Sequence, residues 1–181
     1  LNLENLYSIL RRANSDDTIT LEVKDDESKF YINMEGRSTR NFSLPILNLS
    51  EDDIPSTDQL DFTFEGELET NVLESAIKDA MVVSDSVTVT ASKDSIEISA
   101  EGDQSDVDFK ITEGSEGVLE LSGEEANSMF SLDYLSKMIG AKKLSDTVTV
   151  KMADEFPVRL EFEIPDEANL SFVLAPRIEE E

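Results

Sequence analysis

Three segments of the chain repeat one alternation of polar and apolar residues. They are SDDTITL at 15–21, SDSVTVT at 84–90 and SDTVTVK at 145–151. Apolar side chains occupy every second position, which is typical of an antiparallel strand with one buried face. The segments align on Asp17, Asp85 and Asp146, at intervals of 68 and 61 residues. These intervals match a supersecondary unit and are too long for a short solenoid repeat.

An amphipathic helix is predicted directly before each segment. The apolar positions that share one helical face are Leu3, Leu6, Ile9 and Leu10 in the first, Val72, Leu73, Ala76, Ile77 and Ala80 in the second, and Leu132, Leu135, Met138 and Ile139 in the third. Each helix is short and has a single apolar face. We therefore expect all three to pack on a sheet.

Further alternating segments complete a repeated unit. They lie at 30–34, 95–100, 107–111, 158–164 and 170–174, with turn residues between them. Strands are also predicted ahead of the second and third helices, at 60–68 and 128–132. The pattern predicts an α+β fold of repeated β-α-β-β-β half-domains, with antiparallel sheets and the helices on one face.

Residues 44–57, LPILNLSEDDIPST, follow neither period. The segment has two prolines, an acidic centre and spaced apolar residues, and we interpret it as an extended connector. Its apolar residues either cover a sheet edge or form part of a docking surface, and the sequence leaves both interpretations open.

The composition excludes several kinds of chemistry. The chain has no cysteine and no histidine, so thiol nucleophiles, histidine bases and metal sites built on either residue are excluded. Acidic pairs such as Glu65 and Glu67, or Glu161 and Glu163, are ordinary on a solvated strand face. We therefore expect neither an enzyme nor a cofactor. No apolar run is long enough to span a bilayer, and we expect an intracellular protein, cytoplasmic or nuclear.

The net charge of the chain argues against nucleic-acid binding, whereas the placement of its cations favours it. The formal net charge is −26, with 41 acidic and 15 basic residues, and it repels nucleic acid at long range. Helical wheels nevertheless turn Lys78 and Lys137 about 150° and 170° away from the centre of the apolar faces. Arg12 of the first helix points similarly away, with Arg11 at the flank. One such lysine is explained by the helix dipole and by solvation. The same arrangement in three helices favours a weak, sequence-independent contact with a phosphate backbone.

Several motifs together resemble a known family. These are the three helix-plus-SDxVTV units, the connector LPILNL…IP and the ending LAPRIEEE, together with FSLDYLSKM, LSDTVTVKM and EFPVRLEFEI in the C-terminal third. They resemble the DNA sliding clamp of archaea and eukaryotes, the proliferating cell nuclear antigen family, over essentially the whole chain. The resemblance implies that 1–43 is the C-terminal half of a first clamp domain, 44–57 an interdomain connector and 58–181 a second clamp domain. One further half-domain is then expected ahead of Leu1 in a full-length chain.

The resemblance also implies a function. It implies a homotrimeric ring with sheets outside and helices lining a hole for double-stranded DNA. DNA polymerase, flap endonuclease, DNA ligase and the clamp loader would dock through short QxxLxxFF-type peptides. An adaptor of the same fold that binds peptides without encircling DNA is the alternative.

Carried over residue by residue, the resemblance implies three sets of site residues. The DNA-facing set is Arg11, Arg12, Lys78, Lys137, Lys142 and Lys143. The partner-peptide pocket is Leu44, Leu47, Ile54, Pro55, Ser131, Pro157, Val173, Leu174, Ala175 and Pro176. The subunit interface is Arg40, Phe42, Val107, Phe109 and Ile111, on two edge strands at about 38–43 and 105–111.

Overall fold

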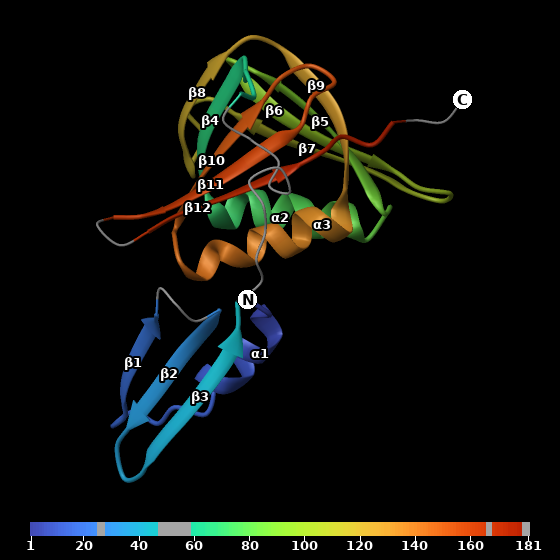
Figure 1. Ribbon diagram of the computed structural model, residues 1–181. Coiled ribbons are helices and arrows are strands. Elements are labelled where there is room, and N and C mark those ends of the chain that lie inside the picture. The colour runs from blue at the N-terminus through green and yellow to red at the C-terminus, as the bar shows by residue number, and fades with distance from the viewer. Residues whose placement is uncertain (25–27, 47–58, 166–167, 179–181) are drawn as a thin grey trace. The chain divides into compact units, whose positions relative to one another are not determined.

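The computed structural model describes residues 1–24, 28–46, 59–165 and 168–178 (Figure 1). The chain divides into a smaller unit, residues 1–56, and a larger unit, residues 57–181. No helix in the described part of the chain is long and apolar enough to cross a membrane.

The smaller unit is one helix on a three-stranded antiparallel sheet of order β1-β2-β3. Its elements are α1 (Leu3–Leu10), β1 (Thr18–Val23), β2 (Lys29–Glu35) and β3 (Thr39–Pro45). Helix α1 begins where the Asn2 side chain accepts a hydrogen bond from the backbone N–H of Asn5, at 2.9 Å. Leu6, Ile9 and Leu10 of its predicted apolar face pack on Ile32, Met34 and Leu44, which form the core of the unit, whereas Leu3 is 73% exposed. β3 continues to Pro45, paired with Lys29, so the unit extends beyond the boundary predicted at 43.

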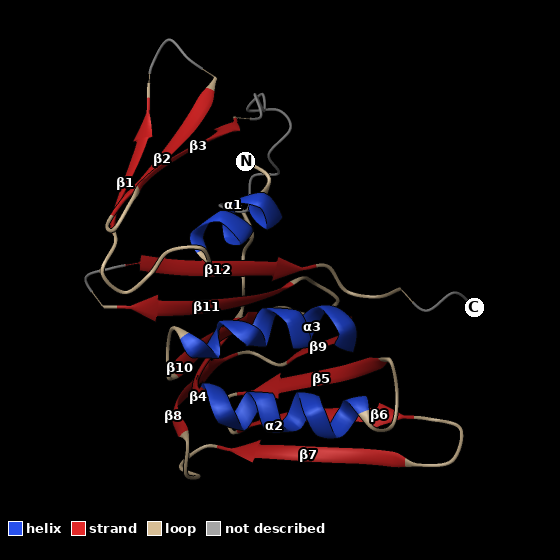
Figure 2. Ribbon diagram, turned by 90° about the horizontal axis from the view of Figure 1, so that it is seen from below, coloured by secondary structure: helices blue, strands red, loops and turns tan. Residues whose placement is uncertain are grey.

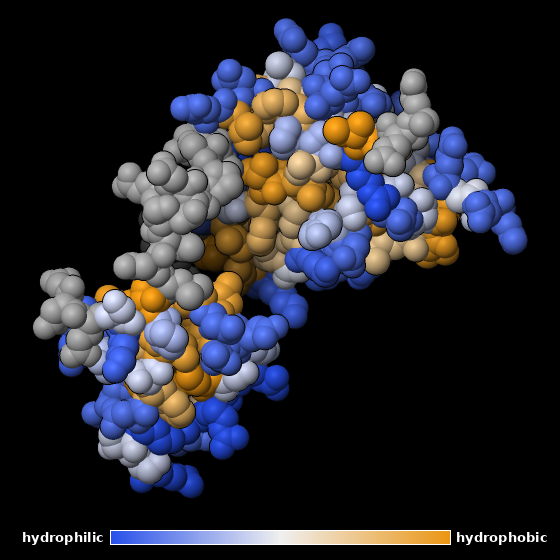
Figure 3. Space-filling view, turned by 45° about the vertical axis from the view of Figure 1, so that its right-hand side comes forward, coloured by the Kyte–Doolittle hydropathy of each residue, from blue (hydrophilic) through white to orange (hydrophobic). Residues whose placement is uncertain are grey.

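Part of the smaller unit's apolar surface stays uncovered (Figure 3). In β1, the side chains of Ile19, Leu21 and Val23 are 39%, 53% and 56% exposed. They lie beside Met34, Ile32 and Phe30 of β2, on the face that α1 covers only in part. The single helix α1 therefore does not bury the whole apolar face of this sheet.

The larger unit contains two related halves. The first consists of β4 (Phe64–Glu69), α2 (Thr70–Met81), β5 (Ser86–Ser92), β6 (Ser95–Glu101), β7 (Asp106–Thr112) and β8 (Val118–Gly123). The second consists of β9 (Ala126–Ser131), α3 (Leu132–Met138), the 3₁₀ helix η2 (Ile139–Lys143), β10 (Thr147–Met152), β11 (Val158–Ile164) and β12 (Ala168–Leu174).

The two halves exchange their leading strands. One sheet has the order β12-β11-β10-β4-β8 and the other β7-β6-β5-β9, so β4 pairs with β10 and β9 with β5. Two of the three repeated aspartates, Asp85 and Asp146, lie at the two crossings. The carbonyl of Asp85 accepts from Leu132 N–H at 3.0 Å, and that of Asp146 accepts from Thr70 N–H at 2.8 Å. Each repeated segment thus fixes the first turn of the other half's helix.

Helices α2 and α3 lie side by side on one side of the two sheets (Figure 2). Leu73, Ile77, Leu132 and Leu135 are at most 7% exposed and join the core of the larger unit. The predicted faces of α2 and α3, the α+β class and the placement of these two helices on one face are confirmed, whereas Leu3 was wrongly placed on the packed face of α1.

Three further details of the prediction were wrong. β8 was not predicted, so the first half is β-α-β-β-β-β; only Leu121 of that strand is buried, and the strand therefore lacks a clear alternation. β4 begins at Phe64 and not at 60. The third helix continues as η2 to Lys143, which places Lys142 and Lys143 inside a helix.

Candidate functional site

Four of the predicted DNA-facing cations lie on the neighbouring helices of the larger unit. Lys78 is on α2, Lys137 is on α3, and Lys142 and Lys143 are on η2. The side chains of Lys78 and Lys137 are 64% and 68% exposed, as the helical wheels predicted. A basic surface therefore forms where α2, α3 and η2 meet.

Carboxylates on the same helices pair with three of these lysines. Glu74 Oε1 accepts from Lys78 Nζ at 2.9 Å and Glu74 Oε2 from Lys142 Nζ at 2.6 Å. Asp133 accepts from Lys137 at 2.7 Å. The hydrogen bond from Lys142, followed by that from Lys78, lowers the pKa of Glu74, and the hydrogen bond to Asp133 raises the pKa of Lys137. Glu74 and Lys137 are therefore charged at neutral pH.

Glu74 was not among the predicted site residues. Its spacing of four residues to Lys78 was a usable signal, because such pairs meet on a helix surface. Its contact with Lys142 joins positions 68 residues apart, and no local pattern predicts it.

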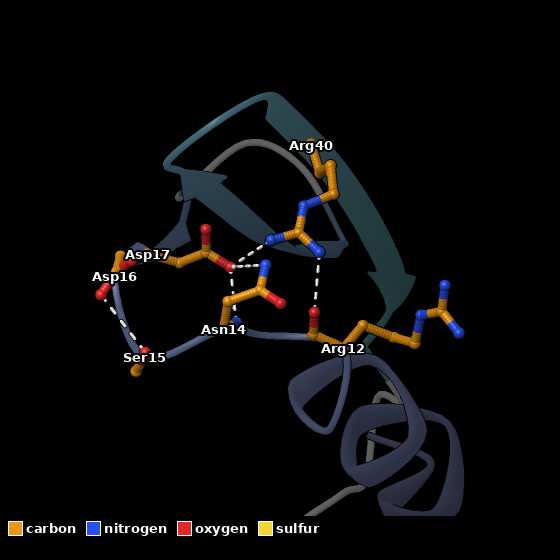
Figure 4. Close-up of polar contacts among 6 residues, drawn as sticks. All are labelled: Arg12, Asn14, Ser15, Asp16, Asp17 and Arg40. Atoms are coloured by element: carbon orange, nitrogen blue, oxygen red, sulfur yellow. Dashed lines mark hydrogen bonds and ion pairs between the residues drawn. The ribbon is translucent and has the colours of Figure 1, made fainter.

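The remaining two DNA-facing candidates belong to the smaller unit. Arg11 ends α1, and its guanidinium lies 5.5 Å from the centre of the Tyr7 ring. Arg12 is exposed in the following turn, and its side chain points away from the polar cluster formed by its neighbours (Figure 4).

That cluster contains Arg40, a predicted subunit-interface residue (Figure 4). Arg40 forms an ion pair with Asp17 and also donates to the Arg12 carbonyl at 2.7 Å. Asp17 accepts from the backbone N–H of Asn14 at 2.7 Å. Arg40 thus links β3 to the end of α1 within the smaller unit.

The two predicted interface strands are sheet edges among the described strands. β3 ends the order β1-β2-β3, and β7 ends the order β7-β6-β5-β9. Phe42, Val107 and Phe109 are half-buried against the cores, and Ile111 is buried. These side chains point inward, so what the edges present to a neighbour is chiefly their main-chain N–H and C=O groups.

A hollow lies where the C-terminal tail passes β9. The N–H of Arg177 donates to the Met129 carbonyl at 2.7 Å, and its guanidinium pairs with Asp85 at 3.0 Å. The hollow of about 660 Å³ is lined by Thr88, Asn127, Ser128, Met129, Glu155, Pro176, Arg177 and Ile178. We call this hollow the tail groove.

The predicted pocket residues are only partly brought together. Pro176 lines the tail groove. Ser131, Pro157, Val173, Leu174 and Ala175 lie at or next to the ends of β9, β11 and β12 in the same unit. Leu44 is buried in the core of the smaller unit, and Leu47, Ile54 and Pro55 lie outside the described residues. The prediction missed Met129 and Arg177, because no sequence pattern signals the contact between tail and strand.

The described residues contain no group of three or more acidic side chains arranged to hold a metal ion. Their arrangement supports binding of polyanions on the helices and of a chain segment at the tail groove.

Comparisons with known proteins agree on one family. Residues 58–177 match the family model described as proliferating cell nuclear antigen, C-terminal domain. The DNA polymerase sliding clamps of Pyrococcus furiosus and Thermococcus gammatolerans are 36% and 38% identical over 181 residues, which cover 99% of this chain and 72% of each relative. A crystal structure of PCNA from Thermococcus kodakaraensis superposes with a TM-score of 0.80 at 29% identity, covering 98% of this chain and 72% of that one.

Proposed function

This chain belongs to the proliferating cell nuclear antigen family, and from that premise we propose that it is a DNA sliding clamp that tethers DNA polymerase to its template. The observation that carries the proposal is the basic surface on α2, α3 and η2. It gathers lysines from both halves of the larger unit, although the chain as a whole has a net charge of −26.

The chemistry of this surface suits sliding better than tight binding. Lysines contact phosphates without reading sequence, and each contact is exchanged with solution ions. Nothing in this role requires a reaction, so we propose a non-catalytic processivity factor.

We further propose that the chain, in its full-length form, closes a homotrimeric ring through pairing of β3 with β7 of a neighbouring molecule. Two free strand edges are a sufficient physical basis for such an interface. Flap endonuclease, DNA ligase and the clamp loader would join the polymerase as partners that dock through short peptides. The tail groove and the adjoining ends of β9, β11 and β12 are the surface we assign to them.

Primer extension on a long template tests the DNA contact. We expect Lys78→Glu combined with Lys137→Glu to shorten the extension products made by a clamp-dependent polymerase, because two attractive charges become repulsive. Binding of a QxxLxxFF peptide to the same variant should be unchanged, which shows that the variant is folded. Products of wild-type length would contradict the DNA-facing assignment.

A further inference from the structure

Glu74 occupies an unusual position among the lysines of the basic surface. Its side chain is 16% exposed, and each of its two oxygens holds a different ammonium group. Lys78 lies one turn further along α2, whereas Lys142 comes from η2 in the other half of the larger unit. One carboxylate therefore bridges two cations that the proposed function assigns to DNA.

The second acidic residue on this surface is arranged differently. Asp133 pairs with Lys137 on the same helix, and both side chains are about 70% exposed, at 71% and 68%. Such a pair is fully hydrated and opens readily. Glu74 is more sheltered and engages two partners at once, so both ion pairs must break before Glu74 releases its two lysines.

We propose that Glu74 attenuates the DNA contact: by bridging Lys78 and Lys142 it lowers the net charge of this cluster from +2 to +1 and occupies donors that phosphates would otherwise use. This inference rests on the proposed function, because it presupposes that these lysines face DNA. A clamp that must move along DNA benefits from few phosphate contacts. Each additional contact would bind the DNA more tightly and would steepen the dependence of binding on salt.

Binding of a short duplex, followed by fluorescence anisotropy between 20 and 200 mM KCl, tests the proposal. We expect Glu74→Gln to bind about 3- to 10-fold more tightly than the wild type at the low-salt end. The slope of log K against log salt should steepen by about 1 to 2, because one or two further phosphate contacts form. Unchanged or weaker binding by Glu74→Gln would overturn the proposal and make Glu74 a residue that holds the lysines in place.

Two matched variants separate the possible causes. Asp79 lies on the same helix outside the Glu74 cluster, so Asp79→Asn removes the same charge without releasing a bridged lysine. An increase as large as that of Glu74→Gln would show a general charge effect and would also contradict the proposal. Glu74→Asp retains the charge and is expected to bind as the wild type does. A gain in affinity for Glu74→Asp would contradict the charge argument.

The lysines themselves distinguish this inference from the proposed function. If Lys78→Gln and Lys142→Gln leave duplex binding unchanged, the DNA-facing assignment fails. If they weaken binding while Glu74→Gln does not strengthen it, the assignment stands and only the attenuating role of Glu74 is wrong.

Discussion

Asp17 shows how one residue of the repeated segment stabilises the smaller unit. Its side chain is only 3% exposed and bonds to Asn14 and Arg40 (Figure 4). Gly36 leaves the room that the carboxylate needs, because a Cβ added there would lie 2.1 Å from Asp17 Oδ1. The carboxylate thus links the turn after α1 to β3 through Arg40.

The hydrogen bonds and the ion pair of the Asp17 carboxylate predict that the stability of the smaller unit depends on pH. The hydrogen bond from the Asn14 backbone, followed by the contacts with Arg40, lowers the pKa of Asp17 in the folded state. The stabilisation is therefore fully present above the unfolded pKa of about 3.9 and is lost as the pH falls through the lower folded pKa. We expect Asp17→Asn to unfold at a lower urea concentration at pH 7, and the deficit to narrow as the pH approaches 2.

Urea unfolding followed by circular dichroism measures this difference. Asp16→Asn is the matched control, because the exposed Asp16 carboxylate accepts from the adjacent Ser15 hydroxyl, at 3.2 Å, and from no other donor among the described residues. Equal midpoints for the Asp17→Asn variant and the wild type at pH 7, or a deficit that does not change with pH, would contradict the assignment.

Site residues could be predicted only where a local period determines their direction. The outward placement of Lys78 and Lys137 follows from the helical wheel, and both side chains are exposed in the structure. Their partners were not all predictable in the same way. Asp133 lies four residues from Lys137, whereas the contact of Lys142 with Glu74 depends on how two half-domains pack.

At the scale of elements, the sequence predicted the helices and strands that have one buried face. Helices α2 and α3 and several strands of the larger unit have a clear contrast between buried and exposed positions, as in β5, where Val87 and Val89 are buried and Thr90 is exposed. β8 has one buried residue, and its pairing with β4 is set by tertiary contacts. The exchange of leading strands between halves is equally non-local, and the sequence pattern carried no sign of it.

A charge introduced beside the tail groove should weaken the binding of partner peptides. Ala175 is exposed between the end of β12 and Pro176, a residue of the groove lining. We expect Ala175→Asp to weaken a QxxLxxFF peptide by about 30-fold or more, because an aromatic anchor would have to bury beside a new charge. Isothermal titration calorimetry measures the affinity. Val82→Asp adds the same charge at a residue that is 85% exposed after α2 and should bind the peptide normally. Equal affinities for the two variants would place the peptide elsewhere.

The edge strands predict a cross-link between molecules. The chain has no cysteine, so any disulfide that forms must come from the introduced cysteines. Ser43 on β3 and Asp106, Asp108 and Lys110 on β7 are exposed on the faces opposite the cores. If the two edges pair, Ser43→Cys combined with one of the three β7 cysteine substitutions should bring two sulfurs within disulfide distance in neighbouring molecules.

Non-reducing electrophoresis of the full-length protein reads out that cross-link. We expect one of the three double variants to form covalent trimers, while each single variant forms none. Failure of all three would contradict pairing of β3 with β7. The three β7 positions lie two residues apart, so each double variant tests a different register that keeps both cysteines on the same face of the joined sheet.

At the scale of the whole molecule, long-range and short-range electrostatics have opposite signs. A net charge of −26 repels DNA, and at physiological salt this repulsion is largely screened beyond a Debye length of about 8 Å. Within that distance the lysines of α2, α3 and η2 attract phosphates, although Glu74 and Asp133 neutralise part of their charge. Under the proposed function we therefore expect a weak direct contact, with stable residence on DNA coming from enclosure in the ring.

Enclosure predicts that retention depends on the topology of the DNA. After loading by its clamp loader, the full-length protein should co-elute with a nicked circular plasmid in gel filtration, even at 200 mM salt. Cutting the plasmid once should release most of it, because sliding off an end requires no bond to break and the weak lysine contacts cannot hold it. A linear plasmid blocked at both ends by bound proteins is the control, and it should retain the clamp. Equal retention on open linear and circular DNA would show that binding energy, and not enclosure, holds the protein in place.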